Sequence, residues 1–321
     1  MMLSRLAAPS ATDRTTRIGW DECPCPLCGC ESAPVVREGQ DPNTVNGLIF
    51  SVVRCPQCQL HYTNPRPDEA SIGRFYPDDY KPHHRTRKNN RTVDRSFFNW
   101  LTGSDCPERR GELPFKGPGK LLDFGCGGGT FLKRMSDLGW EVTGLDAASG
   151  AVQRIRNDLR LPAHLGTLPH PDLAAASFDV ITMWHSLEHV HDPMAVLRAA
   201  FKLLAPGGQL IVAVPNIDSW PARYFGSDWF GLDLPRHLTH FDPKSLKEML
   251  LLAGYKVTNV KLVKHSDWLR SSALLAKRRG RGTTLKHLLT WKPLAKLAAW
   301  LMYMTGQCDC LMAVVERPGT N

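Results

Sequence analysis

The sequence predicts an α/β protein, in which helices cover a mostly parallel sheet and a small cysteine-rich module precedes it. Three observations lead to this prediction. From about residue 118, short apolar runs alternate with helix-like segments of ten or more residues. A glycine-rich turn directly follows the first of these runs. Six of the ten cysteines fall within residues 21–64.

The composition limits the class of protein. With 42% hydrophobic residues in 321, the chain can bury one large core and a smaller module. Its net charge of +9 favours anionic partners such as nucleic acid, acidic lipid or phosphorylated small molecules. The N-terminus has no secretory signal and no run of about 18 apolar residues occurs, so we expect a cytoplasmic protein without a membrane-spanning helix.

Changes in composition divide the chain into segments. In order, we expect a disordered N-terminus (1–20), the cysteine module (21–64), a linker with one or two short helices (65–112) and the main domain (113–321). Two segments of the main domain stand out, an aromatic insertion (219–241) that should lie over the sheet's edge as a lid and a basic amphipathic stretch (267–304).

The main domain alternates in a regular way. Strand-like runs are expected at 120–124, 141–146, 178–184, 209–216, 256–264 and 308–316. Helix-like segments are expected at 129–139, 148–159, 192–208 and 245–255, and three of them are closed by glycine. This order is typical of βαβ units on a parallel sheet.

The glycine-rich turn predicts a nucleoside site. Gly125, Gly127 and Gly129 follow the first strand, where bare backbone and the next helix's N–H groups can approach a ligand. Asp123 lies two residues earlier, and Asp146 ends the next strand, where a carboxylate can accept both hydroxyls of a ribose.

These motifs resemble the class I S-adenosylmethionine-dependent methyltransferases. The family's Asp-x-Gly-x-Gly-x-Gly motif matches 123–129, and "FDVITMWHSLEHVHDP" and "LLAPGGQLIVAVPN" are similar to its fourth-strand and fifth-strand regions. The resemblance implies a Rossmann-like, seven-stranded, mostly parallel sheet with S-adenosylmethionine as cofactor. The implied cofactor-binding residues are Asp123, Gly125, Cys126, Gly127, Gly129, Asp146, Thr167, Leu168, Trp184 and His185. A nicotinamide-binding dehydrogenase on a similar sheet is the alternative.

The cysteine module has the spacing of a zinc ribbon. Cys25-x-x-Cys28 and Cys55-x-x-Cys58 form two turns that each direct two thiolates to one side, which suits a tetrahedral zinc ion. Four cysteine ligands leave no open position, so this zinc would be structural, and Cys23 or Cys30 could replace a ligand. A zinc ribbon here resembles one branch of the methyltransferases, often encoded with enzymes of sugar and polysaccharide metabolism.

A histidine-rich loop follows the fourth strand, where the donor's methyl group should lie. His189 is the first candidate for a catalytic base, His237 is the second, and His185 also lies within reach. Quinone-pathway O-methyltransferases resemble this loop and hold a divalent metal with Glu-x-x-Glu-His, which here would be His185, Glu188 and His189. Alternatively, Glu188 serves a helix N-terminus and His189 simply packs.

The insertion and the basic stretch bear on the acceptor. Aromatic residues of 219–241 could form walls for a ring-shaped acceptor and Arg236 could hold a phosphate or carboxylate, although these rings could also simply pack together. The stretch 267–304 could lie on an anionic membrane as a peripheral contact at the inner face, or cover the sheet with a kink at Pro293.

The function expected from these observations is methyl transfer to a hydroxyl oxygen of a small-molecule or glycan acceptor, which would be lipid-linked if the membrane contact exists. The first alternative is a zinc-ribbon RNA methyltransferase, favoured by the positive charge. The second is a non-catalytic module that binds S-adenosylmethionine as a sensor.

Overall fold

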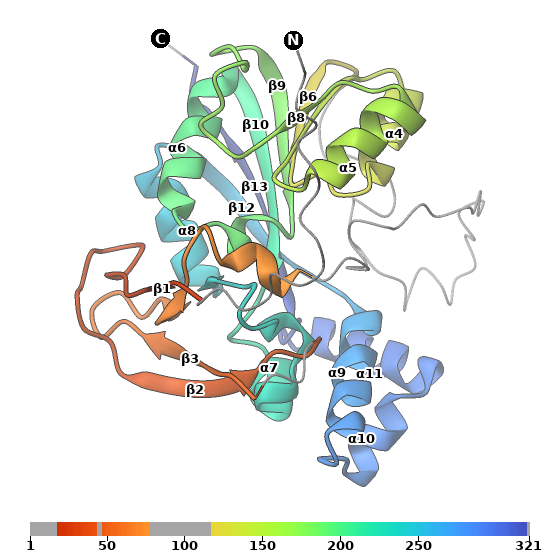
Figure 1. The fold of residues 1–321 in the computed structure, drawn as a ribbon. Helices are drawn as coiled ribbons and strands as arrows, with labels where there is room; N and C mark the ends of the chain where they lie inside the picture. The colour runs from red at the N-terminus through yellow and green to blue at the C-terminus, as the bar shows by residue number, and fades with distance from the viewer. Residues whose placement is uncertain (1–17, 44–46, 77–116, 320–321) are drawn as a thin grey trace, which may run out of the picture.

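The computed structural model describes residues 18–43, 47–76 and 117–319. The expected disordered N-terminus (1–20) lies outside the described residues as far as residue 17. The expected linker (65–112) lies outside them from residue 77 onward. The described chain forms a large sheet with helices on both faces, and the N-terminal module and three C-terminal helices lie together at one end of it (Figure 1).

The main sheet has seven strands in the order β12-β13-β10-β9-β6-β7-β8. All neighbouring pairs are parallel except those of β13, which is antiparallel to both β10 and β12. The predicted Rossmann-like, mostly parallel sheet is therefore confirmed. The strands are β6 (Lys120–Phe124), β7 (Glu141–Asp146), β8 (Ala163–Leu165), β9 (Phe178–Trp184), β10 (Leu204–Pro215), β12 (Lys256–Val263) and β13 (Cys310–Glu316).

Helices cover both faces of the sheet because its central strands are apolar on both sides. Leu121 and Leu122 are adjacent on β6, both are fully buried, and they contribute to separate core clusters. Buried residues of α4 (Thr130–Asp137) and α5 (Ser149–Arg154, continued by η2, Ile155–Leu159) belong to one of these clusters, and buried residues of α6 (Pro193–Leu203) and α8 (Pro243–Leu252) belong to the other.

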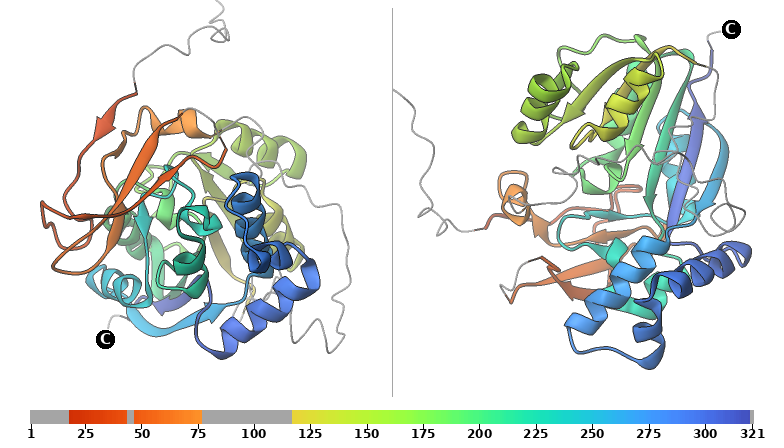
Figure 2. Two further views of the ribbon diagram at one scale, coloured as in Figure 1. Left: turned by 90° about the horizontal axis from the view of Figure 1, so that it is seen from below. Right: turned by 90° about the vertical axis from the view of Figure 1, so that its right-hand side faces the viewer.

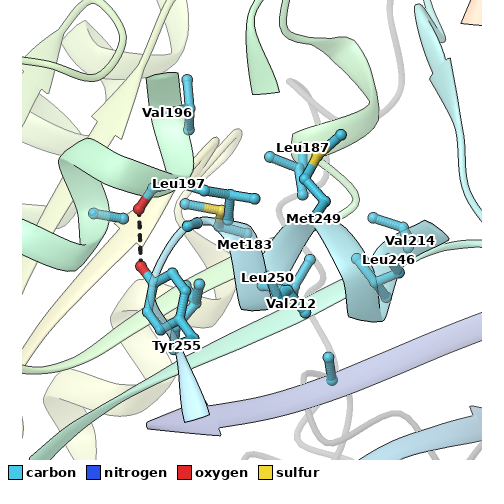
Figure 3. Packing of buried hydrophobic residues seen from close by; sticks show 14 of the residues in the cluster. Met183, Leu187, Val196, Leu197, Val212, Val214, Leu246, Met249, Leu250 and Tyr255 are labelled. Atoms are coloured by element: carbon cyan, nitrogen blue, oxygen red, sulfur yellow. Dashed lines mark hydrogen bonds between the residues drawn. The ribbon is translucent and has the colours of Figure 1, made fainter. Parts of the chain in front are cut away.

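The core under α6 and α8 is tightly packed (Figure 3). Leu197 of α6 and Met249 of α8 are both fully buried there, together with Met183 of β9. The one polar group among them is satisfied, since the Tyr255 hydroxyl donates a hydrogen bond of 3.0 Å to the Leu197 carbonyl oxygen. This core fixes β9, whose end leads into the histidine-rich loop.

The N-terminal module is completed by a strand from the main domain. Its sheet has the order β11-β4-β3-β2, all antiparallel, and β11 belongs to the insertion. A pairing of β1 with β5 and a short helix η1 extend the module past the expected boundary at residue 64. The elements are β1 (Trp20–Asp21), β2 (Val35–Gln40), β3 (Ile49–Arg54), β4 (His61–Thr63), β5 (Arg66–Pro67), η1 (Ile72–Phe75) and β11 (Thr239–His240).

The insertion joins the two modules, and two of its aromatic rings pack between them, while the lid itself stays a prediction. It contains α7 (Trp220–Phe225), η4 (Gly226–Asp228), η5 (Phe230–Leu232) and β11. The rings of Phe225 and Trp229 are buried in a core that also contains Phe50 of β3. These rings pack against the N-terminal module because burying them there removes a large apolar area from water.

The basic stretch forms three helices, α9 (Ser266–Arg278), α10 (Thr284–Leu289) and α11 (Lys292–Met304). They lie beyond the end of the sheet and do not cover its face (Figures 1 and 2). The expected kink at Pro293 is wrong, because this proline stands in the first turn of α11, where its fixed φ favours helix initiation. In the described part of the chain, no helix is long and apolar enough to cross a bilayer.

Candidate active site

The candidate site lies where the chain changes direction across the sheet. From β6 the chain proceeds to β7 and β8 on one side, and then returns to β9 on the other side of β6. The loops after β6 and β9 therefore meet at the C-terminal ends of adjacent strands, which is the usual ligand site of such sheets. The Ser186 hydroxyl links the two loops by donating a 2.9 Å hydrogen bond to the Phe124 carbonyl oxygen.

At two positions of the turn, neighbouring protein atoms leave no room for a side chain, so only glycine fits. Gly125 has a φ of +72°, and an added Cβ would lie 2.4 Å from the Cβ of Ser186. Gly129 has a φ of +74°, and an added Cβ would lie 2.7 Å from side-chain carbons of Ile155 and Leu159. These positions let the β9 loop and the end of α5 approach the turn closely.

Asp146 holds the turn in place. Its Oδ2 accepts a 2.8 Å hydrogen bond from the backbone N–H of Gly127, and its Oδ1 accepts one of 2.8 Å from the backbone N–H of Ala148. Both oxygens are thereby oriented at the end of β7. Asp123 is more deeply buried, and its Oδ1 accepts a 2.7 Å hydrogen bond from the Thr182 hydroxyl on β9.

The other expected cofactor residues differ in exposure. Cys126 and Leu168 are buried, whereas Thr167, which directly precedes Leu168, is exposed. Trp184 packs its ring against Phe131 at a centroid separation of 5.4 Å. The structure thus brings the turn, Asp146 and the end of β9 to one edge of the sheet.

Glu188, His189 and His237 form a compact polar cluster beside this edge. Each has a ligand-type atom within 4.8 Å of the others. The Glu188 carboxylate is fully buried, and among the described residues neither of its oxygens has a hydrogen-bond partner. The insertion is tied to this loop by the backbone, since the N–H of Leu238 donates to the carbonyl oxygen of Glu188 at 2.7 Å.

The two histidines of the cluster are held in the same way. Nδ1 of His189 lies 3.1 Å from the carbonyl oxygen of Arg236, and Nδ1 of His237 lies 2.9 Å from that of Gly231. A carbonyl oxygen only accepts, so each of these bonds is made by the ring form that carries a hydrogen on Nδ1. The Tyr76 hydroxyl also contacts His189 Nδ1 at 2.9 Å.

The environment keeps His189 neutral. Burial and the nearby His237, whose ring centroid is 4.6 Å away, lower the pKa of His189 to about 4. A histidine with this pKa is uncharged at neutral pH and has a free Nε2. His189 therefore has the protonation state that a proton acceptor requires, while its lowered pKa makes it a weaker base than an ordinary histidine.

His185 lies apart from this pair. Its backbone has a φ of +53°, its ring packs 4.8 Å from that of Trp268 on α9, and its Nδ1 is 3.7 Å from Glu188 Oε1. The expected ligand set of His185, Glu188 and His189 is thus corrected: the residue that joins Glu188 and His189 is His237. His237 comes from the insertion, so the spacing of residues along the chain could not show that it lies beside this loop.

Arg236 cannot bind an anionic acceptor group, contrary to expectation. Its side chain is fully buried, and it forms ion pairs of 2.7 Å with both Asp41 and Asp233. Its other terminal nitrogen donates to the carbonyl oxygen of Phe75 at 2.6 Å. The guanidinium is therefore a structural connection between the insertion and the N-terminal module.

The four expected cysteines converge in the N-terminal module. Cys25 Sγ is 3.4 Å from Cys58 Sγ, and Cys28 Sγ is 3.4 Å from Cys55 Sγ. The two turns match, because the N–H of Gly29 donates to the Cys25 carbonyl oxygen as that of Gln59 does to Cys55. Such a set fits a tetrahedral zinc ion. The sulfurs of Cys23 and Cys30 are not part of this group.

Sequence reasoning missed several residues of the site. Tyr76, Asp233 and Asp41 lie in segments without a periodic pattern, so nothing indicated them. His265 was detectable, because it follows the strand 256–263 and must lie at the same edge of the sheet as the other strand ends.

The seven-stranded sheet, with its glycine turn and acidic residue at the next strand end, defines a class I S-adenosylmethionine-dependent methyltransferase. The chain belongs to the methyltransferase-domain family, whose model matches residues 87–260. It is 33% identical over 175 residues to the ubiquinone biosynthesis O-methyltransferases of Xanthomonas euvesicatoria pv. vesicatoria and Xanthomonas campestris pv. campestris, which covers 50% of this chain and 71% of each relative.

Solved structures with a similar shape include two other methyltransferases. One is an S-adenosylmethionine-dependent methyltransferase from Mesorhizobium loti, with 21% identity, a TM-score of 0.47, and coverage of 69% of this chain and 99% of that chain. The other is from Methanosarcina mazei, with 16% identity, a TM-score of 0.45, and coverage of 64% and 95%.

Proposed function

We propose that this methyltransferase acts on a hydroxyl oxygen of a small-molecule or glycan acceptor. The observation that carries the proposal is the Glu188–His189–His237 cluster, which offers the neutral imidazole of His189 and a second imidazole next to the donor edge of the sheet. The relatives named ubiquinone biosynthesis O-methyltransferase also support an oxygen acceptor.

The proposed mechanism is an in-line displacement. S-adenosylmethionine would supply an activated methyl group, which the acceptor oxygen would take as the carbon–sulfur bond breaks, with S-adenosylhomocysteine as the leaving group. The acceptor's proton passes to Nε2 of His189, or of His237. Asp146 would accept the ribose hydroxyls, and the turn at 125–129 would hold the donor through its backbone N–H groups.

Incubation with labelled S-adenosylmethionine and cell fractions tests the proposal. We expect label in a small-molecule or lipid-linked pool, bound as an alkali-stable ether. Label in RNA, with an RNA affinity that falls steeply with salt, would favour the RNA methyltransferase instead. Tight donor binding without turnover on any fraction would favour a non-catalytic module.

Replacing His189 or His237 with alanine is expected to separate catalysis from donor binding. Loss of the base should lower kcat by about 10²- to 10⁴-fold, while calorimetric affinity for S-adenosylmethionine stays unchanged. His287→Ala, on exposed α10, is the matched control and should keep full activity. Full activity in both His189→Ala and His237→Ala would contradict the assignment.

The same cluster has a ligand set for a divalent cation. Two imidazoles and a buried carboxylate, whose oxygens have no hydrogen-bond partner among the described residues, suit such an ion. Chelator treatment that leaves the ribbon intact distinguishes the two roles. Retained activity would assign the imidazoles as bases, and activity restored by one divalent ion would assign them as ligands.

The ribbon zinc would be structural. We expect Cys28→Ser to lose one equivalent of zinc and to lower the melting temperature, because the four-cysteine turns have only a thin core of their own. Cys23→Ser is the control and should retain the metal, since its sulfur lies outside the group. Equal zinc content in the two variants would contradict this ligand assignment.

The exposed surface of helices α10 and α11 suits contact with an anionic membrane. Only Leu289 of α10 and two alanines of α11 are buried. Large apolar side chains are instead exposed along both helices, next to lysines such as the exposed Lys292: Leu285, Leu288, Trp291, Leu297, Leu301, Tyr303 and Met304. An apolar surface flanked by cations suits an acidic bilayer surface, where a lipid-linked acceptor would be available.

Vesicle sedimentation tests this contact. The wild-type chain should bind vesicles containing phosphatidylglycerol, less so at high salt, and Trp291→Ser with Leu301→Ser should weaken binding at least tenfold. Leu138→Ser is the control, because Leu138 is equally exposed but lies at the end of α4. Equal loss in the control, or no binding by the wild type, would exclude the membrane contact.

A further inference from the structure

A second group of metal-ligand side chains lies at the same edge of the main sheet. His185 follows β9, His265 follows β12 by two residues, and Cys310 is the first residue of β13. Because β13 is antiparallel to its neighbours, its beginning lies beside the ends of β10 and β12. One ligand atom from each of the three residues lies within 4.8 Å of the others.

His185 carries an independent sign of a ligand. Among the described residues, neither of its ring nitrogens has a hydrogen-bond partner, although both nitrogens are buried. Its backbone also has a φ of +53°, which is unfavourable for a residue with a Cβ. The buried nitrogens and the unfavourable backbone conformation are both explained if the ring is held in this orientation to bind a ligand that is not part of the protein chain.

We propose that His185, His265 and Cys310 bind a zinc ion that is distinct from the ion of the ribbon. Two imidazoles and one thiolate are ligands for zinc and exclude magnesium and calcium, which prefer oxygen. Three protein ligands leave a fourth position open, as in catalytic zinc sites.

Glu188 would support this ion from outside its ligand shell. Its Oε1 lies 3.7 Å from Nδ1 of His185, so binding of the ion by the other ring nitrogen would create a carboxylate–histidine–metal arrangement. If the proposed transfer to an oxygen is correct, an ion at this edge would lower the pKa of an acceptor hydroxyl bound to it. The ion's binding itself does not depend on which acceptor is used.

Aromatic packing is the competing explanation. The rings of His185 and His265 lie 4.8 Å and 4.9 Å from that of Trp268, and such packing would position both imidazoles. It would not account for the nearby thiol or for the two unpaired nitrogens of His185. The two explanations differ in the amount of metal that they predict.

Metal content of the full chain, purified with a reductant and saturated with zinc, tests the proposal. We expect His265→Ala and Cys310→Ser each to hold one equivalent fewer than the wild type. Cys308→Ala is the matched control, because it removes another buried thiol of the same segment outside the group, and it should hold as much as the wild type. When cobalt replaces zinc, His265→Ala should lose the visible absorption of the second site. It should keep the bands of the four-cysteine site in the ribbon.

One equivalent in the saturated wild type, with the ribbon bands intact, would overturn the proposal. Equal loss in Cys308→Ala and Cys310→Ser would do the same. Calorimetric binding of S-adenosylmethionine by each variant identifies misfolding. Metal content is measured without turnover, so a failure of the proposed methyl transfer would leave this result unchanged.

Discussion

Replacing Arg236 with alanine is expected to lower the free energy of unfolding by about 3–5 kcal/mol. The guanidinium is fully buried between the carboxylates of Asp41 and Asp233, each 2.7 Å away. Removing it would leave two buried carboxylates next to each other without a cation, which is the costly way to break such a group. Chemical denaturation of the purified chain measures the loss.

Two further variants make this prediction specific. Arg223→Ala removes an arginine that pairs with Asp218 at 2.8 Å on the surface, and it should change stability by less than about 0.5 kcal/mol. Adding Asp41→Asn and Asp233→Asn to Arg236→Ala should recover part of the lost stability, because the repulsion disappears. A loss below about 1 kcal/mol in Arg236→Ala would contradict the buried network.

Replacing Gly125 with alanine should disrupt the donor site and destabilise the protein by about 2–5 kcal/mol. A Cβ at a φ of +72° costs about 1–2 kcal/mol. The clash at 2.4 Å with Ser186 adds about 1–3 kcal/mol of overpacking, since the β9 loop must move. We expect affinity for S-adenosylmethionine, measured by calorimetry, to fall at least tenfold with it.

Gly150→Ala is the control for this substitution. Gly150 lies in the first turn of α5, has no neighbouring atom within 4 Å of an added Cβ and has no left-handed φ. Alanine there should leave donor affinity unchanged and raise stability by up to about 1 kcal/mol. If the two alanine variants bound the donor equally well, the close approach of the two loops would not matter for the site.

The sequence predicted the main sheet well because its strands are apolar on both faces. Residues 120–124, 141–146 and 178–184 were expected as strands with the bounds that they have. The two-residue strands β1, β5 and β11 were not expected, because a pair of residues carries no periodicity. They form through pairing between segments far apart in the chain, which a local pattern cannot report.

Individual residues of the candidate site were predicted from the sequence, but their arrangement relative to one another was not. His189 and His237 were expected as alternative bases, yet they form a pair with rings 4.6 Å apart. Arg236 was expected to hold a phosphate or carboxylate, because guanidinium groups bind such anions well. Its partner Asp41 is 195 positions away, and only the folded chain brings that carboxylate to it.

The strand β11 also bears on the order of synthesis. The four-cysteine turns leave the ribosome early, but the edge of their sheet stays open until residues 239–240 have been made. Asp41 must wait equally long for its cation. The N-terminal sheet is therefore complete only once the insertion has been made, and a protein shortened to begin at residue 117 would leave β11 without its partner β4.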